Sequence, residues 1–241
     1  MSVSENWFTP FISPMISVTF QKERVSQLYP MRVNEKSGIS SYPKEEIANA
    51  VTHGIGAIVA IAGLVVMTVL TDVLEEPGYL VYGITLVLLY LTSTLYHSIS
   101  HWRAKNIFRK LDHMAIFLLI AGTYTPYCLD VLDGWMRWTV FGIIWGCAGA
   151  GIVMKGFYTG KLEWLSVSFY VLMGWMAVFV MKPIYNSISF PGFLCLLIGG
   201  LAYTFGTYFY INKRIRFSHS IWHLWVLAGS TFHFFSIMTM L

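Results

Sequence analysis

Two histidines near the end of the chain, His219 and His223, stand four residues apart in the stretch FSHSIWHLWVLAGSTFHFF. Four residues turn an α-helix by about 400°, so both imidazoles leave the same helix face, one turn apart. Two neutral imidazoles that converge in this way are a ready pair of ligands for a divalent metal, with zinc the best match. Ionisable rings at the edge of an apolar helix cost free energy unless something satisfies them. The spacing therefore predicts a metal site that takes further ligands from elsewhere in the chain.

The composition identifies the elements that must position these side chains. Of the 241 residues, 56% are apolar and only 12% are charged, and the mean hydropathy is +0.61. Soluble domains carry about 25% charged residues, so the composition predicts an integral membrane protein. Seven apolar segments, each near the roughly 20 residues that cross a bilayer, cover about residues 50–71, 79–99, 111–129, 137–155, 164–182, 190–211 and 219–240.

The connections between these segments are short, which predicts antiparallel neighbours in one all-α bundle of seven transmembrane helices. We expect this transmembrane domain to cover residues 46–241, after a polar, flexible cytoplasmic tail at residues 1–45. Glycines inside the segments suit close packing of helices. They are Gly142, Gly146, Gly149, Gly151, Gly199 and Gly200.

The positive charges predict the orientation. Of the 16 lysines and arginines, all except Arg137 and Lys182 fall in the tail or in loops on one side of the membrane. The positive-inside rule then predicts a cytoplasmic amino terminus and, after seven spans, a carboxyl terminus outside. The net charge of +4 is thus a topology signal, and we expect no nucleic-acid partner. The three cysteines show no C-x-x-C spacing, so neither a thiolate metal site nor a disulfide framework is expected.

Further polar residues are expected at the same membrane depth as the histidine pair. The second segment runs toward the cytoplasm and ends in STLYHS, which places His97 in its last turn and Ser93 one turn deeper on the same face. The third segment starts from that side with Leu111-Asp112-His113, so Asp112 is expected in its first turn. Three histidines and one carboxylate, from three helices, would then share one layer of the membrane.

This set of residues predicts a catalytic site. Three histidines and a water molecule are the ligand set of a catalytic zinc, so we assign His97, His219 and His223 as the metal ligands. Zinc brings the pKa of a bound water toward about 7. We expect Asp112 to hold this water and accept its proton, and Ser93 to hydrogen-bond Asp112, the water or a substrate oxygen.

The remaining histidines fit the layer less well. His53 opens the first segment on the same side, and its role stays open between a contact with ligand or substrate and simple capping or packing. His113 points about 100° away from the residue before it and should lie outside the ligand shell. His233 lies about 15 Å deeper than the pair, which favours a buried hydrogen bond, whereas His101 should be solvated in a basic loop. Residues 121–126, AGTYTP, predict a local kink with hydroxyls covering the freed carbonyls.

These motifs resemble those of the hemolysin III family, the bacterial branch of the progestin and adipoQ receptor family. The resemblance covers about residues 44–240, through EEIANAVTHGIGA, STLYHS, KLDHMAIFLLIAGTYTP and FSHSIWHLWVLAGSTFHF. The family pattern of Ser-x3-His, Asp and His-x3-His falls without departure on Ser93, His97, Asp112, His219 and His223. It implies a seven-helix protein of the bacterial cell membrane, with a zinc bound by the three histidines near the cytoplasmic face and reached by the aspartate through water.

Three functions remain open. Receptor relatives look like slow lipid amidases acting on ceramide, and bacterial members are linked to membrane-lipid homeostasis, which implies a zinc-dependent hydrolase of lipid amides or esters with membrane lipids as partners. A non-catalytic sensor or receptor with a structural zinc explains the histidines, but a structural site usually has four protein ligands. A pore-forming haemolysin, after the family name, needs a polar lining across the membrane. The outer halves of these segments offer few charged residues for such a lining.

Overall fold

A computed structural model of the chain describes residues 44–72, 74–160 and 162–241. The predicted tail lies outside these residues, except that Lys44 and Glu45 belong to the first helix. The described chain is helical and contains no strand. Its elements are α2 (Lys44–Leu70), α3 (Pro77–Ser98), α4 (Trp102–Pro126), the π-helical η1 (Tyr127–Val131), α5 (Gly134–Tyr158), α6 (Glu163–Trp175), the 3-10 helix η2 (Met176–Val180), α7 (Met181–Ser187), α8 (Phe190–Ile211) and α9 (Ser218–Met238).

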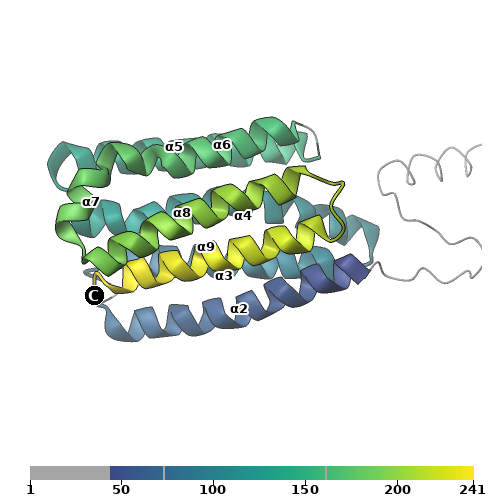
Figure 1. The fold of residues 1–241 in the computed structure, drawn as a ribbon, viewed down its shortest axis with the longest axis horizontal. Coiled ribbons are helices and arrows are strands. Elements are labelled where there is room, and N and C mark those ends of the chain that lie inside the picture. The colour runs from purple at the N-terminus through teal and green to yellow at the C-terminus, as the bar shows by residue number, and fades with distance from the viewer. Residues whose placement is uncertain (1–43, 73, 161) are drawn as a thin grey trace, which may run out of the picture. The chain divides into compact units, whose positions relative to one another are not determined.

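Seven of the described helical segments are long and apolar enough to cross a membrane, with α6, η2 and α7 forming one span. The helices lie side by side along the long axis of the bundle, with α5 and α6 along one edge and α2 along the other (Figure 1). Large apolar side chains face outward, as a lipid environment requires; Val69 is 76% exposed and Phe179 is 83% exposed. The predicted all-α multi-pass membrane protein is confirmed.

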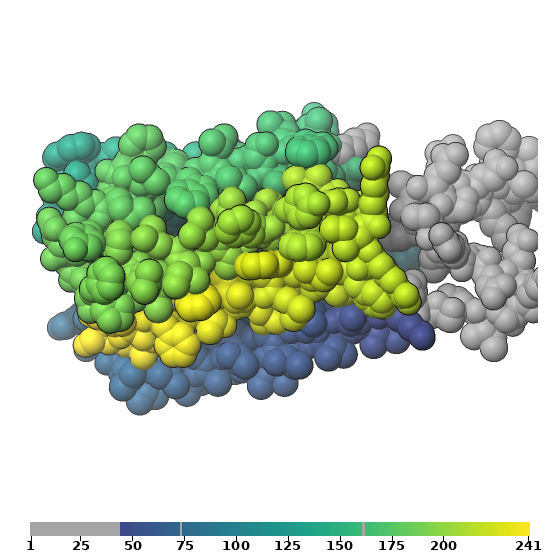
Figure 2. All heavy atoms as spheres, viewed as in Figure 1, coloured from purple at the N-terminus to yellow at the C-terminus, as the bar shows by residue number. Residues whose placement is uncertain are grey.

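The helix pairs that pack most extensively are neighbours in sequence, α2 with α3, α3 with α4, and α8 with α9. The last helix, α9, also packs against the first, α2. Figure 2 shows α2, α9 and α8 as successive bands of atoms on one face of the bundle. Because the spans alternate in direction, α2, α4 and α9 begin at the end of the bundle where α3 stops, which we call the histidine end.

One helix boundary changes the position of a predicted site residue. The helix α4 begins at Trp102, about nine residues before the start predicted from hydropathy. The ring of His101 caps this helix by accepting a hydrogen bond from the backbone N–H of Ala104 at 3.5 Å. Asp112 therefore lies in the third turn of its helix, and its predicted place in the first turn was wrong. Hydropathy reports the apolar part of a helix, whereas the hydrogen-bonded helix continues through the polar turns WRAKNIFRK.

At the position of the predicted kink, α4 ends at Pro126 and the π-helical η1 begins. The hydroxyls of Thr123 and Thr125 donate to the carbonyls of Leu119 and Ala121, each at 2.8 Å. Neither is the carbonyl that Pro126 leaves without its helical donor, which belongs to Gly122, so these two hydrogen bonds are not the predicted covering of a freed carbonyl.

The glycines divide into two groups. A Cβ at Gly151 would overlap the ring of Phe117, and a Cβ at Gly199 would overlap the ring of His233, so both glycines permit close helix contacts. The predicted close packing was wrong for four others, which face open space in this structure. They are Gly142, Gly146, Gly149 and Gly200.

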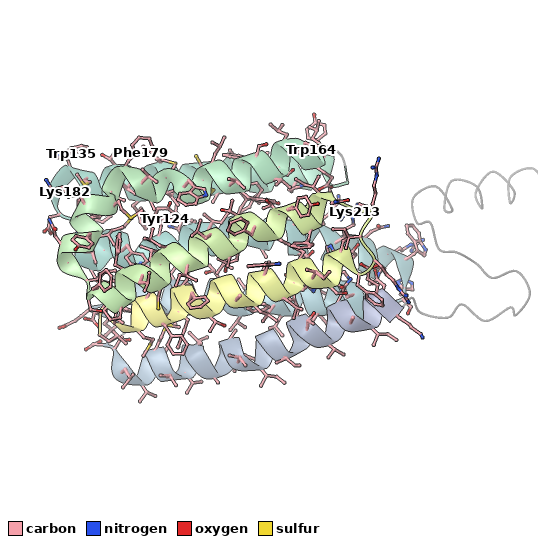
Figure 3. The ribbon with its side chains drawn as sticks, viewed as in Figure 1. Tyr124, Trp135, Trp164, Phe179, Lys182 and Lys213 are labelled. Carbon is pink, nitrogen blue, oxygen red and sulfur yellow. The ribbon has the colours of Figure 1, made fainter. Side chains whose placement is uncertain are left out.

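Aromatic and basic side chains mark the two ends of the bundle. Figure 3 shows Trp135 and Lys182 near one end and Trp164 and Lys213 near the other. Tryptophan and lysine favour the two interfaces of a membrane, where an apolar body meets a wet polar tip. Which end faces the cytoplasm remains the prediction drawn from the charges.

Candidate metal centre

The three predicted ligands meet at the histidine end of the bundle. His97 comes from the last turn of α3, and His219 and His223 come from the first two turns of α9. One ligand atom of each imidazole lies within 4.8 Å of the others. His97 and His223 are each only 2% exposed. The helix pattern in the sequence and the bundle topology together thus bring all three rings to one point.

The arrangement fits a divalent metal. Ligand nitrogens of a tetrahedral zinc site lie about 3.3 Å apart, given metal–nitrogen bonds of about 2.0–2.1 Å. The ligand atoms here lie within 4.8 Å of one another, somewhat farther apart than around a bound zinc. Three imidazoles suit zinc and several other first-row ions, and they leave a coordination position open for water or substrate. We therefore treat these histidines as a metal-binding set, with zinc the predicted ion.

The ring nitrogens that face away from this point are fixed by the first helix, α2. His223 Nδ1 lies 3.2 Å from the backbone oxygen of Asn49 and 3.2 Å from Thr52 Oγ1. A carbonyl oxygen can only accept, so Nδ1 carries the proton and Nε2 keeps its lone pair. His97 Nδ1 lies 3.1 Å from Glu46 Oε2, which is also an acceptor. Both rings therefore present Nε2 as the ligand atom.

Further contacts come from the same face of α2. Glu45 Oε1 accepts a hydrogen bond from the backbone N–H of His219 at 3.2 Å. Asn49 Oδ1 accepts one from Ser220 Oγ at 2.6 Å. The sequence prediction missed these supporting residues, although the pattern E-E-x-x-N-x-x-T places polar side chains on one face of an apolar helix.

Asp112 and Ser93 line the same cavity as His219 and His223. Asp112 is 9% exposed, and its Oδ2 lies 3.7 Å from His113 Nδ1. Ser93 is fully buried, and among the described residues its Oγ has no hydrogen-bond partner. A buried hydroxyl without a partner costs free energy, so Ser93 Oγ is suited to bind a polar group that enters the cavity.

His53 lies beside the three histidines but cannot share their metal. Its ring stacks on that of His223, with centroids 3.5 Å apart and planes only 9° apart. A metal bound to an imidazole nitrogen lies in the plane of that ring, whereas the lone pairs of the stacked ring lie in a parallel plane. Both nitrogens of His53 are buried without a partner in the described part of the chain, and the residue lines the cavity.

The other histidines lie where the sequence predicted. His113 Nδ1 donates to the backbone oxygen of Arg109 at 2.7 Å, and the residue is not part of the three-histidine group. His233 Nε2 donates to the backbone oxygen of Leu196 at 3.2 Å. His101 is exposed. The deeper histidine therefore makes the expected hydrogen bond, in a part-buried position.

The cavity has a volume of about 160 Å³ and extends from the histidines into the bundle. Its deep part reaches His233, about 15 Å further along α9 than His223. Apolar side chains from α4, α6, α7, α8 and α9 form most of the wall between these points; they include Ile120, Val171, Ile184, Leu196 and Val226. The cavity is thus polar at the histidine end and mainly apolar beyond it.

Seven membrane-spanning helices with three histidines converging at one end define a class of polytopic membrane protein with a candidate metal centre. The model of the family described as Haemolysin-III related matches residues 41–234. The chain therefore belongs to the hemolysin III family, as its motifs predicted.

Similar proteins occur in bacteria and animals. The Hemolysin-3 homolog of Bacillus subtilis (strain 168) is 44% identical over 199 residues, which cover 81% of this chain and 93% of that protein. Hemolysin-3 of Bacillus cereus is 43% identical over 204 residues, 83% of this chain and 93% of that protein. The human monocyte to macrophage differentiation factor is 30% identical over 205 residues, 80% of this chain and 83% of that protein.

Proposed function

We propose that this protein is a metal-dependent hydrolase that cleaves an amide or ester bond of a membrane lipid. One observation carries the proposal. Three imidazoles converge at the histidine end, and two of them, His219 and His223, line a mainly apolar cavity that the Asp112 carboxylate and the unpartnered Ser93 hydroxyl also line. A lipid fits this cavity, because its polar linkage could lie at the histidine end and its acyl chain in the apolar part beyond it.

Each residue would have a separate role in this reaction. His97, His219 and His223 would hold the metal, most suitably zinc. When bound, the metal supplies a nucleophile from water at neutral pH and polarises the carbonyl of the substrate. Asp112 would accept the proton that the attacking water loses, and Ser93 Oγ would donate a hydrogen bond to the carbonyl oxygen as negative charge develops there.

The overall reaction adds one water across the carbonyl–nitrogen or carbonyl–oxygen bond. The hydroxide part stays on the acyl carbon and gives a fatty acid. The proton held by Asp112 passes to the leaving nitrogen or oxygen and gives an amine or an alcohol. The apolar wall formed by residues such as Ile120, Ile184 and Val226 would hold the acyl chain and keep bulk water from the deep part of the cavity.

Two other functions have less support. A sensor with a structural metal explains the histidines, yet a structural site usually has four protein ligands, and this cluster of described residues supplies three. Pore formation is suggested by the name of the Bacillus cereus relative, Hemolysin-3. A water-filled pore needs a polar lining through the bilayer, whereas this cavity is mainly apolar beyond its histidine end.

The test uses the purified full chain in lipid nanodiscs, loaded with one equivalent of zinc. The loaded protein is incubated with a panel of lipid amides and esters, and released fatty acid is measured by mass spectrometry. Asp112→Asn keeps the shape of the side chain and removes the base, so it should keep the metal and lower turnover by about 10²–10⁴-fold. Fully loaded protein that releases no fatty acid from any lipid class would favour the sensor.

A further inference from the structure

We propose that Glu46, held in place by Lys105, is the positioning residue of the metal centre, because its carboxylate orients His97 for metal binding. Neither residue is a ligand in this assignment. The inference rests on the metal site of the proposed function and does not depend on hydrolysis.

The contacts join three helices at the histidine end. Glu46 Oε2, on α2, lies 3.1 Å from Nδ1 of His97, on α3. Lys105 Nζ, near the start of α4, lies 3.0 Å from the same carboxylate oxygen. The same ammonium donates to the backbone oxygen of Tyr96 at 2.9 Å. Lys105 therefore bonds both the carboxylate and the last turn of the helix that carries the ligand.

The carboxylate decides which nitrogen of His97 is available. An ionised carboxylate only accepts hydrogen bonds, so it keeps the proton on Nδ1 and leaves the lone pair on Nε2. Its negative charge also raises the donor strength of the ring toward a cation on the opposite nitrogen. His97 is 2% exposed, so water provides little competing hydrogen bonding at the ring. Carboxylates in this position typically change metal affinity by about 10–100-fold.

Two acceptors face the Nδ1 atoms of the metal-binding histidines: the Glu46 carboxylate at His97 and a backbone oxygen at His223. Of these two, only the carboxylate can be removed by a substitution. The equivalent nitrogen of His223 is held by the backbone oxygen of Asn49, which every residue at that position would retain. The carboxylate next to Glu46 supplies a matched control. Glu45 has the same charge on the same helix, but within the described chain it accepts from the backbone N–H of His219 and makes no hydrogen bond to a ring nitrogen.

The first experiment measures zinc affinity of the purified full chain in detergent, by competition with a chromophoric chelator and without substrate. We expect Glu46→Gln to lower the affinity by about 10–100-fold while keeping one zinc per chain at saturation. Glu45→Gln should change it by less than about threefold, because the glutamine amide oxygen can still accept the hydrogen bond from the backbone N–H of His219. Glu46→Asp, which keeps the charge on a shorter side chain, should restore part of the loss. Equal affinities for Glu46→Gln and Glu45→Gln would overturn the proposal.

Exchanging the charges of Glu46 and Lys105 distinguishes a role in positioning His97 from a role in holding α2 and α4 together. The double variant Glu46→Lys/Lys105→Glu keeps an ion pair between α2 and α4 but places an ammonium beside His97. If the pair served stability alone, the exchange would restore both the thermal unfolding temperature of the metal-free protein and its zinc affinity. We expect the unfolding temperature to recover relative to Glu46→Lys and the zinc affinity to stay at or below that of Glu46→Gln. Wild-type zinc affinity in the exchanged protein would contradict the assignment.

The result is independent of the proposed chemistry. A loss of zinc affinity confined to Glu46 variants supports the positioning role even if no lipid is hydrolysed. Conversely, lipid hydrolysis that depends on Asp112, together with unchanged zinc affinity in Glu46→Gln, would support the enzyme and reject the positioning role.

Discussion

The imidazole rings of His53 and His223 stack face to face, with centroids 3.5 Å apart and planes 9° apart. The stack places an aromatic ring against one face of His223, a proposed metal ligand, and so restricts the rotation of that side chain. Because the two rings lie in parallel planes, only His223 can direct a nitrogen toward the point shared with His97 and His219.

This stacking predicts that His53→Phe keeps the metal. Phenylalanine retains the flat face that packs on His223 and removes both ring nitrogens. We expect one zinc per chain, with an affinity within a few-fold of the wild type, by elemental analysis and chelator competition. If His53→Phe abolished zinc binding while His97→Ala left it intact, His53 would be the third ligand and the assignment of His97 would be wrong.

Removal of the three ligands should have a different effect from removal of the aspartate. His97→Ala, His219→Ala and His223→Ala should each weaken zinc binding, and the double variant His219→Ala/His223→Ala should abolish it. Asp112→Ala should retain much of the zinc, because its contact is proposed to run through water, with a loss in zinc affinity of at most about 10–100-fold, as is typical of an outer-shell residue. Metal content after dialysis checks each variant. An Asp112→Ala protein that purifies without metal would make the aspartate a direct ligand.

Two glycines on α5 should respond in opposite ways to the same substitution. A Cβ at Gly151 overlaps the ring of Phe117, whereas a Cβ at Gly149 meets open space. Gly151→Ala should lower the free energy of unfolding by about 1–3 kcal/mol through overpacking. Gly149→Ala should leave it unchanged or raise it by up to about 1 kcal/mol, because alanine favours the helix. Thermal unfolding in one detergent compares the pair, and equal destabilisation would place the α4–α5 contact elsewhere.

The orientation in the membrane is tested with reporter fusions. The charge distribution predicts that a fusion after Leu241 reports the outside, and that fusions at Arg103 or Arg214 report the cytoplasm. A cytoplasmic carboxyl terminus would reverse the assignment and place the three histidines near the outer face.

Local sequence patterns were sufficient to predict much of the fold and of the candidate site. Apolar length marks each span because a bilayer demands about 20 residues. The spacing of His219 and His223 places both rings on one face because a helix repeats every 3.6 residues. Alternation of the spans then brings His97 to the same end. These predictions depend on periodicity and chain direction, which can be read from short stretches of sequence.

The tertiary structure alone decided how helices distant in sequence meet. Hydropathy could not show that α4 begins at Trp102, because polar turns outside the apolar core also form helix. The glycine pattern could not separate Gly151, which faces Phe117, from Gly149, which faces open space. The pairing of Glu46 with His97 joins residues 51 positions apart. It arises because α2 packs against both α3 and α9, a contact set by side-chain fit across the bundle and by no local repeat.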